Sequence, residues 1–526
     1  MRRWSRLLML ISFAVVVMQL TTIGIAMVHL NHDSKSSANV FGVFQHDVLS
    51  PQEYLKTQYK QKETNRTQPS IEKDHSIPEE EDASSPPAET DERDLIHIVH
   101  TRFMQHQGNL TTLGVARLKQ FTAFCLPTMV HQTTQNFLWI IKVDPLLEEN
   151  EESRKKVLEP LVEAVSAHEE NNIYVVASNY NFNMEGHKGS WKDGEEGEEL
   201  VASNQTNKTL AKVYTGDMDR LRRAYELRQE FPVLETRLDA DDGLSIEYLE
   251  EVQRIALDRF LGDKSSEDNK AEPIPKPQWL YWCILTQIEW HSEIYSNNST
   301  NTTTSTAKRD SWEIRNSVKK YYGNQSYGYM VPIANENFCI TPGLTVGYGI
   351  GASVESVPRY PHTSLYAKLH NKFKFCYATE DKQSWHKGPC LERMGGMSKN
   401  PEGKTSYSIH AVRSRTVTSA GMDGVGNSDS LNQTVKESEG TTISTPKTKE
   451  QQKIEGLLWR LLTDHFAIDP QAVQRTQDYF SENRMMIALE NSLGQCSMGH
   501  SCKGKARERL QKIVEAHSKL LNNKTL

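Results

Sequence analysis

The chain has little of what a disulfide scaffold or a nucleic-acid-binding protein needs. Its 526 residues include only seven cysteines, too few to staple a fold of this length. The net charge of −7 and the pI near 6.2 provide no basic excess for a polyanion. The composition therefore excludes a disulfide framework and argues against nucleic acid as a partner.

Apolar residues are also scarce, at 37% of the sequence. A compact protein of this size usually has more, so we expect polar inserts and linkers to take up much of the length.

No internal repeat is present. The Gly-rich run at 341–351 lacks the Gly-Lys-Ser/Thr of a P-loop. We interpret it as a tight turn lining a pocket or as a flexible connection.

One long apolar run stands out near the N-terminus. Leu7–Leu30 carries no formal charge and exceeds the roughly 20 residues that cross a bilayer. Three arginines precede it, so the positive-inside rule places residues 1–6 in the cytosol and the body of the protein in the secretory lumen. Gly24-Ile25-Ala26 resembles a signal-peptide cleavage site, which is the alternative. The run is long for a signal peptide, and we therefore favour an uncleaved anchor in a single-pass type II Golgi membrane protein.

A luminal location agrees with ten triplets of the N-glycosylation type. They begin at Asn65, Asn109, Asn204, Asn207, Asn297, Asn298, Asn301, Asn324, Asn432 and Asn523. An oxidising lumen also permits disulfides, and we expect Cys376 to be able to pair with Cys390, and Cys496 with Cys502. Zinc held by Cys496, His500 and Cys502 is a weaker alternative.

Composition divides the chain into six parts. We expect a cytosolic tail (1–6), a transmembrane signal-anchor (7–30), a flexible stem (31–93), a catalytic domain (94–422), a disordered linker (423–452) and a C-terminal helical segment (453–526). Polar inserts interrupt the catalytic domain near 183–206, 262–276 and 296–312.

Strand and helix patterns alternate through the first half of the catalytic domain. We expect strands at 95–99, 136–143, 172–177 and 231–238, separated and followed by helices at 111–132, 149–169, 207–230 and 245–261. Such alternation indicates an α/β fold of Rossmann type, with a mostly parallel sheet and flanking helices. Further on, the pattern predicts a hairpin of 279–285 with 288–295 and short strands at 329–333 and 338–340. Helices follow at 453–464, 470–491 and 503–521.

Polar residues gather where the predicted strands end. Thr101-Arg102, Asp144, Asn179 and Asp239-Ala240-Asp241-Asp242 should meet at one edge of the sheet. Ligands of open α/β sheets bind at that edge.

Three carboxylates within four residues repel one another, so a hard cation is the usual reason to hold them together. The sequence therefore predicts Mg²⁺ or Mn²⁺ bridging a nucleotide sugar's diphosphate, with Asp241 as metal ligand and Asp239 toward the ribose or sugar. Asp242 would share the metal or cap the next helix. The alternative is a helix-capping turn with surplus acid.

Other residues complete the candidate site. Arg102, Arg117 and Arg237 could bind phosphate oxygens through their guanidinium groups. His386 or His410 could supply a further metal ligand from the second half, although a lone histidine is more often structural. Asp381, beside Glu380, is a candidate general base, with a solvated acidic turn as the alternative.

The residues also resemble a known family. The blocks His100-Thr101-Arg102-Phe103, 117–139 and 236–242 resemble the rhamnosyltransferase family in order and spacing, and 412–422 resembles a late block of its eukaryotic, including algal, members. The resemblance covers about 95–260 well and 326–422 loosely. It implies a GT-A-like glycosyltransferase domain with the Asp239–Asp242 motif as donor and metal site. Thr101, Arg102 and Arg117 carry over more weakly, and no catalytic base carries over.

We therefore expect a glycosyltransferase that moves a hexose or deoxyhexose, rhamnose among them, from a nucleotide sugar to a glycan or protein. A non-catalytic luminal carbohydrate-binding protein on the same fold is one alternative. A metal-dependent hydrolase that uses the Asp cluster is another.

Overall fold

The structure is a computed structural model. It describes residues 95–168, 172–178, 189–194, 197–202, 212–262, 276–293, 321–334, 338–352, 357–358, 360–370, 376–377, 389–399, 405–418, 447–497, 508 and 512–513. The expected tail, signal-anchor and stem lie outside these residues, as do the insert at 296–312 and nearly all of the one at 262–276. None of the helices within the described ranges has the length and apolar character that spanning a bilayer requires.

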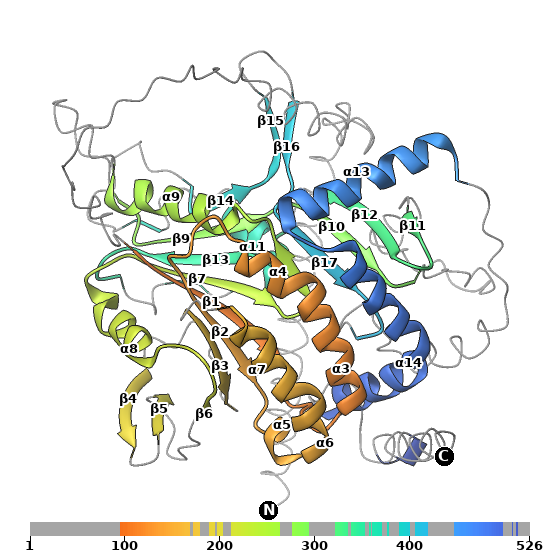
Figure 1. Cartoon of the computed structure of the whole chain (residues 1–526). Coiled ribbons are helices and arrows are strands. Elements are labelled where there is room, and N and C mark those ends of the chain that lie inside the picture. Colours follow the sequence, from red (N-terminus) through yellow and green to blue (C-terminus); the bar gives the residue numbers. More distant parts are fainter. Residues whose placement is uncertain are drawn as a thin grey trace, which may run out of the picture. The chain divides into compact units, whose positions relative to one another are not determined.

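An eight-stranded mixed sheet forms the centre of the described part (Figure 1), in the order β14-β9-β13-β7-β1-β2-β3-β6. Four consecutive members are parallel, as expected: β7 (Val233–Asp239), β1 (Ile96–Phe103), β2 (Leu138–Val143) and β3 (Ile173–Ala177). Their near-continuous burial matches the apolar runs typical of parallel strands covered on both faces.

The remaining strands make the sheet less parallel than expected. β13 (Leu344–Tyr348) runs antiparallel to both β7 and β9 (Trp279–Ile284), while β14 (Leu391–Met394) is parallel to β9. On the other side β6 (Lys212–Val213) pairs antiparallel with β3. The Gly-rich run therefore contains a buried strand, and our interpretation of it as a turn or a flexible connection is wrong.

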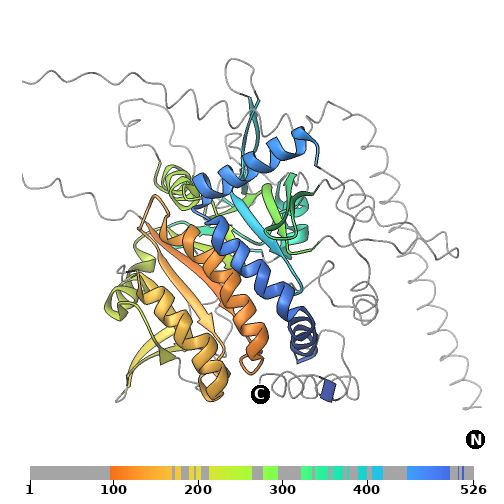
Figure 2. The same ribbon diagram turned by 45° about the vertical axis from the view of Figure 1, so that its right-hand side comes forward.

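A second sheet of five strands adjoins the first (Figure 2), in the order β11-β12-β10-β17-β8. Its members are β11 (Tyr322–Asn324), β12 (Gly328–Ala334), β10 (Thr286–His291), β17 (Ala411–Arg415) and β8 (Asp242–Leu244). The expected hairpin of β9 with β10 is wrong, because a single residue, Leu285, separates two strands that belong to different sheets. The expected strand at 338–340 is not a strand either.

The helix after β1 changes its winding partway along. α3 (Thr111–Gln120) continues through a π-helical turn, η1 (Phe121–Cys125), into α4 (Leu126–Val130). The N–H of Leu126 bonds to the carbonyl of Phe121, five residues back, just before Pro127, which has no N–H to donate. The predicted helix at 111–132 is thus confirmed, although it ends at Val130.

The other helices follow the predicted order. After β2 come α5 (Leu146–Glu149), α6 (Glu151–Ser153), η2 (Arg154–Leu158) and α7 (Glu159–Ser166), and after β7 and β8 comes α9 (Tyr248–Leu261). α8 (Met218–Glu226) is shorter than the predicted 207–230, because β6 occupies part of that range and a 3₁₀ turn, η4 (Leu227–Gln229), follows. α11 (His362–Leu369) lies between β13 and β14.

Smaller elements lie along the chain between these. A hairpin of β4 (Gly189–Gly194) and β5 (Gly197–Ala202) falls within the predicted polar insert, and β15 (Gly396–Lys399) pairs with β16 (Thr405–Ser408). At the C-terminal end α13 (Lys449–Phe466) and α14 (Pro470–Ser497) confirm two predicted helices. α13 starts inside the predicted linker, because Thr448 and Gln451 form a capping box there.

Two disulfides tie the second half of the fold. Cys376–Cys390 is the pair expected from the sequence, and Cys283–Cys339 was not foreseen. Cys125 is a buried free thiol. The expected pair of Cys496 and Cys502 lies outside the described side chains.

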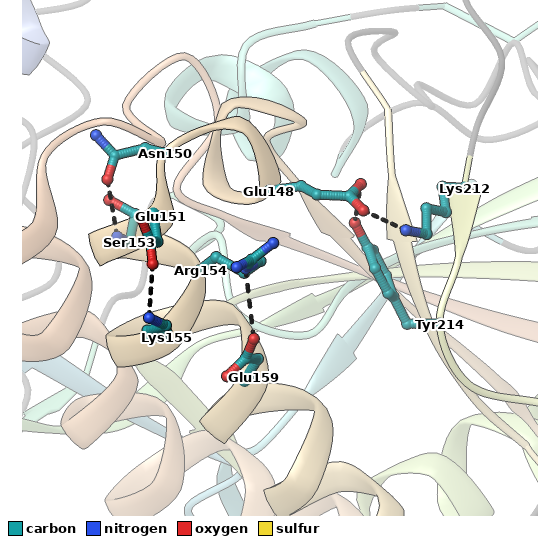
Figure 3. A network of polar contacts seen from close by, with 9 residues as sticks. All are labelled: Glu148, Asn150, Glu151, Ser153, Arg154, Lys155, Glu159, Lys212 and Tyr214. Carbon is teal, nitrogen blue, oxygen red and sulfur yellow. Dashed lines mark hydrogen bonds and ion pairs between the residues drawn. The ribbon is translucent and has the colours of Figure 1, made fainter.

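A polar network closes the far edge of the large sheet (Figure 3). The carboxylate of Glu148 on α5 accepts hydrogen bonds from Lys212 on β6 and, at 2.8 Å, from the hydroxyl of Tyr214. The Lys212 hydrogen bond is the main reason that the pKa of Glu148 is lowered. Asn150 caps α6 through the N–H of Ser153 at 2.9 Å. These contacts hold the short edge strand β6 beside α5, at the edge farthest from β14.

Candidate functional site

The register of the parallel strands aligns the polar strand ends. Arg102 on β1 lies opposite Asp239 on β7 and opposite Lys142 on β2. Asp144 follows directly after β2. The expectation that these strand ends meet at one edge is therefore confirmed for these positions, while Asn179 lies outside the described residues.

The three carboxylates lie where the chain passes from the first sheet to the second. β7 ends at Asp239, Ala240 and Asp241 form a turn, and β8 begins at Asp242. Asp239 and Asp241 are half-buried, whereas Asp242 is buried and accepts a hydrogen bond from the backbone N–H of Ser414 at 3.0 Å. Asp242 therefore serves to join β8 and β17, and the alternative that it caps the next helix is wrong, since α9 starts six residues later.

Burial and mutual repulsion act on these acids. Desolvation and then the charge of Asp239 raise the pKa of Asp241, and desolvation and then Asp241 raise the pKa of Asp242 well above its usual range. The same acids, after burial itself, raise the pKa of the Cys125 thiol, so that thiol stays protonated and unreactive. The turn thus crowds acidic groups whose ionised forms need arginines or a cation to offset their charge.

Arginines surround the turn from four elements. Arg237 Nη2 lies 3.8 Å from Asp239 Oδ1, and Arg102 is the cross-strand neighbour of Asp239. Burial and then repulsion by Arg237 lower the pKa of Arg102, against the attraction of Asp239. Arg117 on α3 and Arg413 on β17 partly offset the rise in the pKa of Asp241. All three arginines proposed from the sequence are brought together, and Arg413, which lies opposite Asp242, was missed.

Arg117 is held by polar groups on its own side of the site. Its Nη1 donates to Gln107 Oε1, and its Nη2 donates to the carbonyl oxygen of Thr418 at 3.4 Å. Burial lowers its pKa, and the charges of Asp241 and Asp239 oppose that shift. Its guanidinium group is therefore held on α3 within range of the charges of the acidic turn.

Thr101 and Asp144 have structural partners. Thr101 is buried, and its hydroxyl accepts a hydrogen bond from Trp139 Nε1 at 2.8 Å. The buried carboxylate of Asp144 accepts from the backbone N–H groups of Gly108 at 3.1 Å and Leu146 at 3.0 Å. These contacts give Thr101 a place in the core and give Asp144 a role in starting α5.

His410 is placed against α9 and lies apart from the acidic turn. Its Nδ1 lies 3.2 Å from the hydroxyl of Ser245, and its Nε2 lies 3.6 Å from a carboxylate oxygen of Glu251. Burial lowers its pKa to about 4, so it is neutral at physiological pH. The suggested metal set of Asp239, Asp241, Asp242 and His410 is not brought together, and among the described residues no three His, Cys, Asp or Glu side chains are grouped to hold a metal ion.

A smaller oxygen set, Asp239 and Asp241, has the donor chemistry that a divalent cation takes. Mg²⁺ is usually bound by one or two carboxylates, with phosphate oxygens and water completing the shell, and Mn²⁺ accepts the same donors. Asp239 and Asp241 are half-buried and lie at the carboxyl end of β7, where desolvation and then the charge of Asp239 raise the pKa of Asp241. Asp381 and His386 lie outside the described residues.

One histidine near the site was not singled out from the sequence. His362 begins α11, and its Nδ1 lies 3.2 Å from the carbonyl oxygen of Cys339. Burial is the main reason that its pKa is lowered, with Arg413 and Arg237 lowering it further and Asp239 raising it. It has no motif around it, so only the fold places it near the acids.

Comparison with known proteins yields little. No family model matches the chain, and no curated protein matches it. The solved structures similar to it include S. aureus TarS 1–349 in complex with UDP-GlcNAc, with 10% sequence identity over 81% of this chain and 92% of that chain and a TM-score of 0.22. Another is S. aureus TarS, with 11% identity over 77% and 53% of the two chains and a TM-score of 0.20. Likeness at these TM-scores carries no argument about fold or function.

Proposed function

We propose that the chain is a glycosyltransferase, which moves a hexose or a deoxyhexose such as rhamnose from a nucleotide sugar to a hydroxyl group of a glycan or protein. The observation that carries this proposal is the pairing of Arg102 with Asp239 at the carboxyl edge of the sheet. Cationic and anionic groups alternate there, with Arg237, Arg117 and Asp241 nearby. A diphosphate needs the cations, and a ribose or sugar hydroxyl is well matched by the carboxylates.

The reaction places defined demands on these groups. The acceptor oxygen forms a bond to the anomeric carbon, and the bond from that carbon to the diphosphate oxygen breaks with its electron pair leaving on the diphosphate. The acceptor's hydroxyl proton passes to a base, for which Asp381 remains our candidate. Arg102 and Arg237 would offset the charge that grows on the departing diphosphate.

A divalent cation belongs to this proposal. Mn²⁺ or Mg²⁺ would supply additional charge neutralisation for the diphosphate when bound. Asp239 and Asp241 would hold it, while Asp242 keeps its bond to the strand β17. The cation would thereby offset the repulsion between the carboxylates, which after desolvation is the next cause of the raised pKa of Asp241.

The cellular setting is also proposed. The uncharged run Leu7–Leu30 and the ten glycosylation triplets support a type II Golgi membrane protein with a luminal catalytic domain. Extraction of cell membranes with alkaline carbonate tests the anchor. Retention in the membrane pellet is expected, and complete release would contradict an uncleaved anchor.

The activity is tested with the luminal fragment and a panel of nucleotide sugars, with and without Mn²⁺. We expect one donor to raise the melting temperature, because binding to the folded state stabilises it. Asp241→Asn should abolish metal-dependent transfer while leaving the melting temperature close to that of the wild type. Asp219→Asn, at an exposed position on α8, is the matched control and should retain full activity.

Two other results would each indicate a different function. Glycan binding without donor turnover or cation dependence would indicate a carbohydrate-binding protein. Cleavage of a substrate without a nucleotide sugar would indicate a hydrolase.

A further inference from the structure

The C-terminal helix α14 packs along α3, the helix that carries Arg117 (Figure 1 and Figure 2). The backbone of α3 receives no side-chain cap from its own N-cap residue, Leu110. Instead, the carboxylate of Glu490 on α14 accepts a hydrogen bond from the N–H of Leu113 at 2.7 Å. A negative charge at a helix N-terminus satisfies open N–H groups and is favoured by the helix dipole. α14 therefore fixes the start of α3.

One turn further along, α14 touches a group that holds Arg117. Gly494 lies against Gln107, and a Cβ added at this glycine would overlap the Gln107 amide nitrogen and lie 2.8 Å from its Cδ. Gln107 is fully buried, and its amide oxygen accepts from Arg117 Nη1. The absence of a side chain at Gly494 leaves Gln107 the space that this hydrogen bond needs.

The second acceptor of Arg117 is also supported by α14. Asn491 Nδ2 donates to the carbonyl oxygen of Val417 at 2.7 Å. The next residue, Thr418, offers its carbonyl oxygen to Arg117 Nη2, and its hydroxyl donates to Gln120 Oε1 on α3 at 2.8 Å. Both oxygens that orient the Arg117 guanidinium group are thus braced by the same helix.

We propose that α14 is a positioning element of the candidate site: Gly494 and Asn491, acting through Gln107 and the 417–418 segment, aim Arg117 at the acidic turn. The part of this inference that concerns the diphosphate of a donor rests on the proposed function. The orientation of Arg117 does not. The sequence gives no hint of this role, because α14 lies outside every block of the family resemblance.

The test uses Gly494→Ala in the complete luminal protein. The added methyl group meets the side chain of Gln107 and no backbone atom among the nearest contacts, so the overlap is relieved when Gln107 moves away from Arg117. Gly456→Ala is the matched control, because this glycine on α13 has nothing within 4 Å of an added Cβ. Both variants should stay folded, with Gly456→Ala slightly more stable than the wild type.

The first readout is independent of any donor. Modification of Arg117 by phenylglyoxal, followed by mass spectrometry, reports whether its guanidinium group is still held. We expect faster modification in Gly494→Ala and in Gln107→Ala, and a wild-type rate in Gly456→Ala. An unchanged rate in Gly494→Ala would overturn the inference, whatever the protein binds.

The second readout is affinity for a nucleoside diphosphate. From UDP, GDP, ADP and dTDP we would use the one that stabilises the wild type most. Gly494→Ala should weaken its binding roughly tenfold, about the effect of one charged hydrogen bond. The double variant with Gln107→Ala should bind no more weakly than Gln107→Ala alone, since the two changes remove the same contact.

The two readouts together distinguish a failure of the proposed function from a failure of the positioning role of α14. Failure of the wild type to bind any of the four, together with faster Arg117 modification in Gly494→Ala, would refute the proposed function and keep the positioning role. Wild-type affinity in both Gly494→Ala and Gln107→Ala would refute the positioning role and keep the function.

Discussion

His97 on β1 and Thr236 on β7 share a hydrogen bond of 2.8 Å between imidazole Nε2 and the hydroxyl oxygen, inside the large sheet. Thr236 in turn bonds to the hydroxyl of Thr345 on β13 at 2.6 Å, and Gln253 on α9 lies 3.1 Å from the other imidazole nitrogen. A buried polar chain thus crosses three strands just behind the strand end that carries Asp239.

The buried histidine in this hydrogen-bonded network makes the fold sensitive to acid. Burial lowers the pKa of His97 to about 3, from an ordinary value of 6.5. Below pH 6.5 the unfolded chain takes up a proton that the folded protein rejects. The free energy of unfolding should therefore fall as the pH drops from 6.5 toward 3, by up to about 1.4 kcal/mol per pH unit for this residue.

Denaturant titrations across that pH range measure the effect. His97→Gln should show a shallower loss of stability than the wild type, because glutamine does not titrate. His131→Gln, at an exposed position, is the control and should follow the wild-type slope. Equal slopes for all three proteins would show that His97 does not contribute.

Gly343 should tolerate no side chain. Its φ is 73°, and an added Cβ would overlap Ile284 and lie 2.9 Å from Leu244. Left-handed backbone costs about 1–2 kcal/mol for a residue with a Cβ, and overpacking about 1–3 kcal/mol more. We expect Gly343→Ala to lower the melting temperature by several degrees or to abolish folding.

Gly351→Ala separates the cost of the left-handed backbone from the cost of overpacking at Gly343. Gly351 has a similar φ of 69° but nothing within 4 Å of an added Cβ, so only the backbone strain applies. Its loss of stability should be clearly smaller than that of Gly343→Ala in the same thermal unfolding experiment. Equal losses would mean that packing against Ile284 does not matter.

Arg102 should affect donor binding more than folding. It lies at the strand edge beside Asp239, where a guanidinium group can offer two donors to a phosphate. We expect Arg102→Ala to raise the KM for the donor about tenfold or more, and Arg102→Lys to recover only part of that loss. Initial rates over a series of donor concentrations measure it.

The control for Arg102 is Arg223→Ala, at an exposed position on α8. It removes a positive charge without changing the strand edge, and its kinetics should match the wild type. A wild-type KM in Arg102→Ala would exclude Arg102 from the donor site.

Local patterns predicted the parallel half of the large sheet and its site edge. Apolar runs such as Ile173–Ala177 identify buried strands, and the order of strands and helices requires their ends to align. The sequence alone therefore places Arg102, Asp239 and Asp241 together. The pairing of Cys376 with Cys390 followed from their short separation.

The sequence predictions were wrong or incomplete where contacts between distant parts of the chain decide the structure. Gly347 reads as part of a turn, but its lack of a side chain lets β13 lie between the side chains of Trp282 and Leu234. Leu285 separates two strands of different sheets, which no local pattern reveals. Arg413 and His362 approach the acids only through the second sheet and α11, so nothing in their neighbouring residues marks them.

The reliance of α3 on Glu490 has a consequence for biosynthesis. Every strand of both sheets leaves the ribosome before α14 does, so a nascent chain can build the sheets while the first turn of α3 still lacks its cap. By the positioning role proposed above, Arg117 reaches its final orientation only after α14 has docked. A message that ends between the codons of Thr418 and Pro470 would encode every strand of both sheets but not α14. Its product would therefore lack the helix that completes the site.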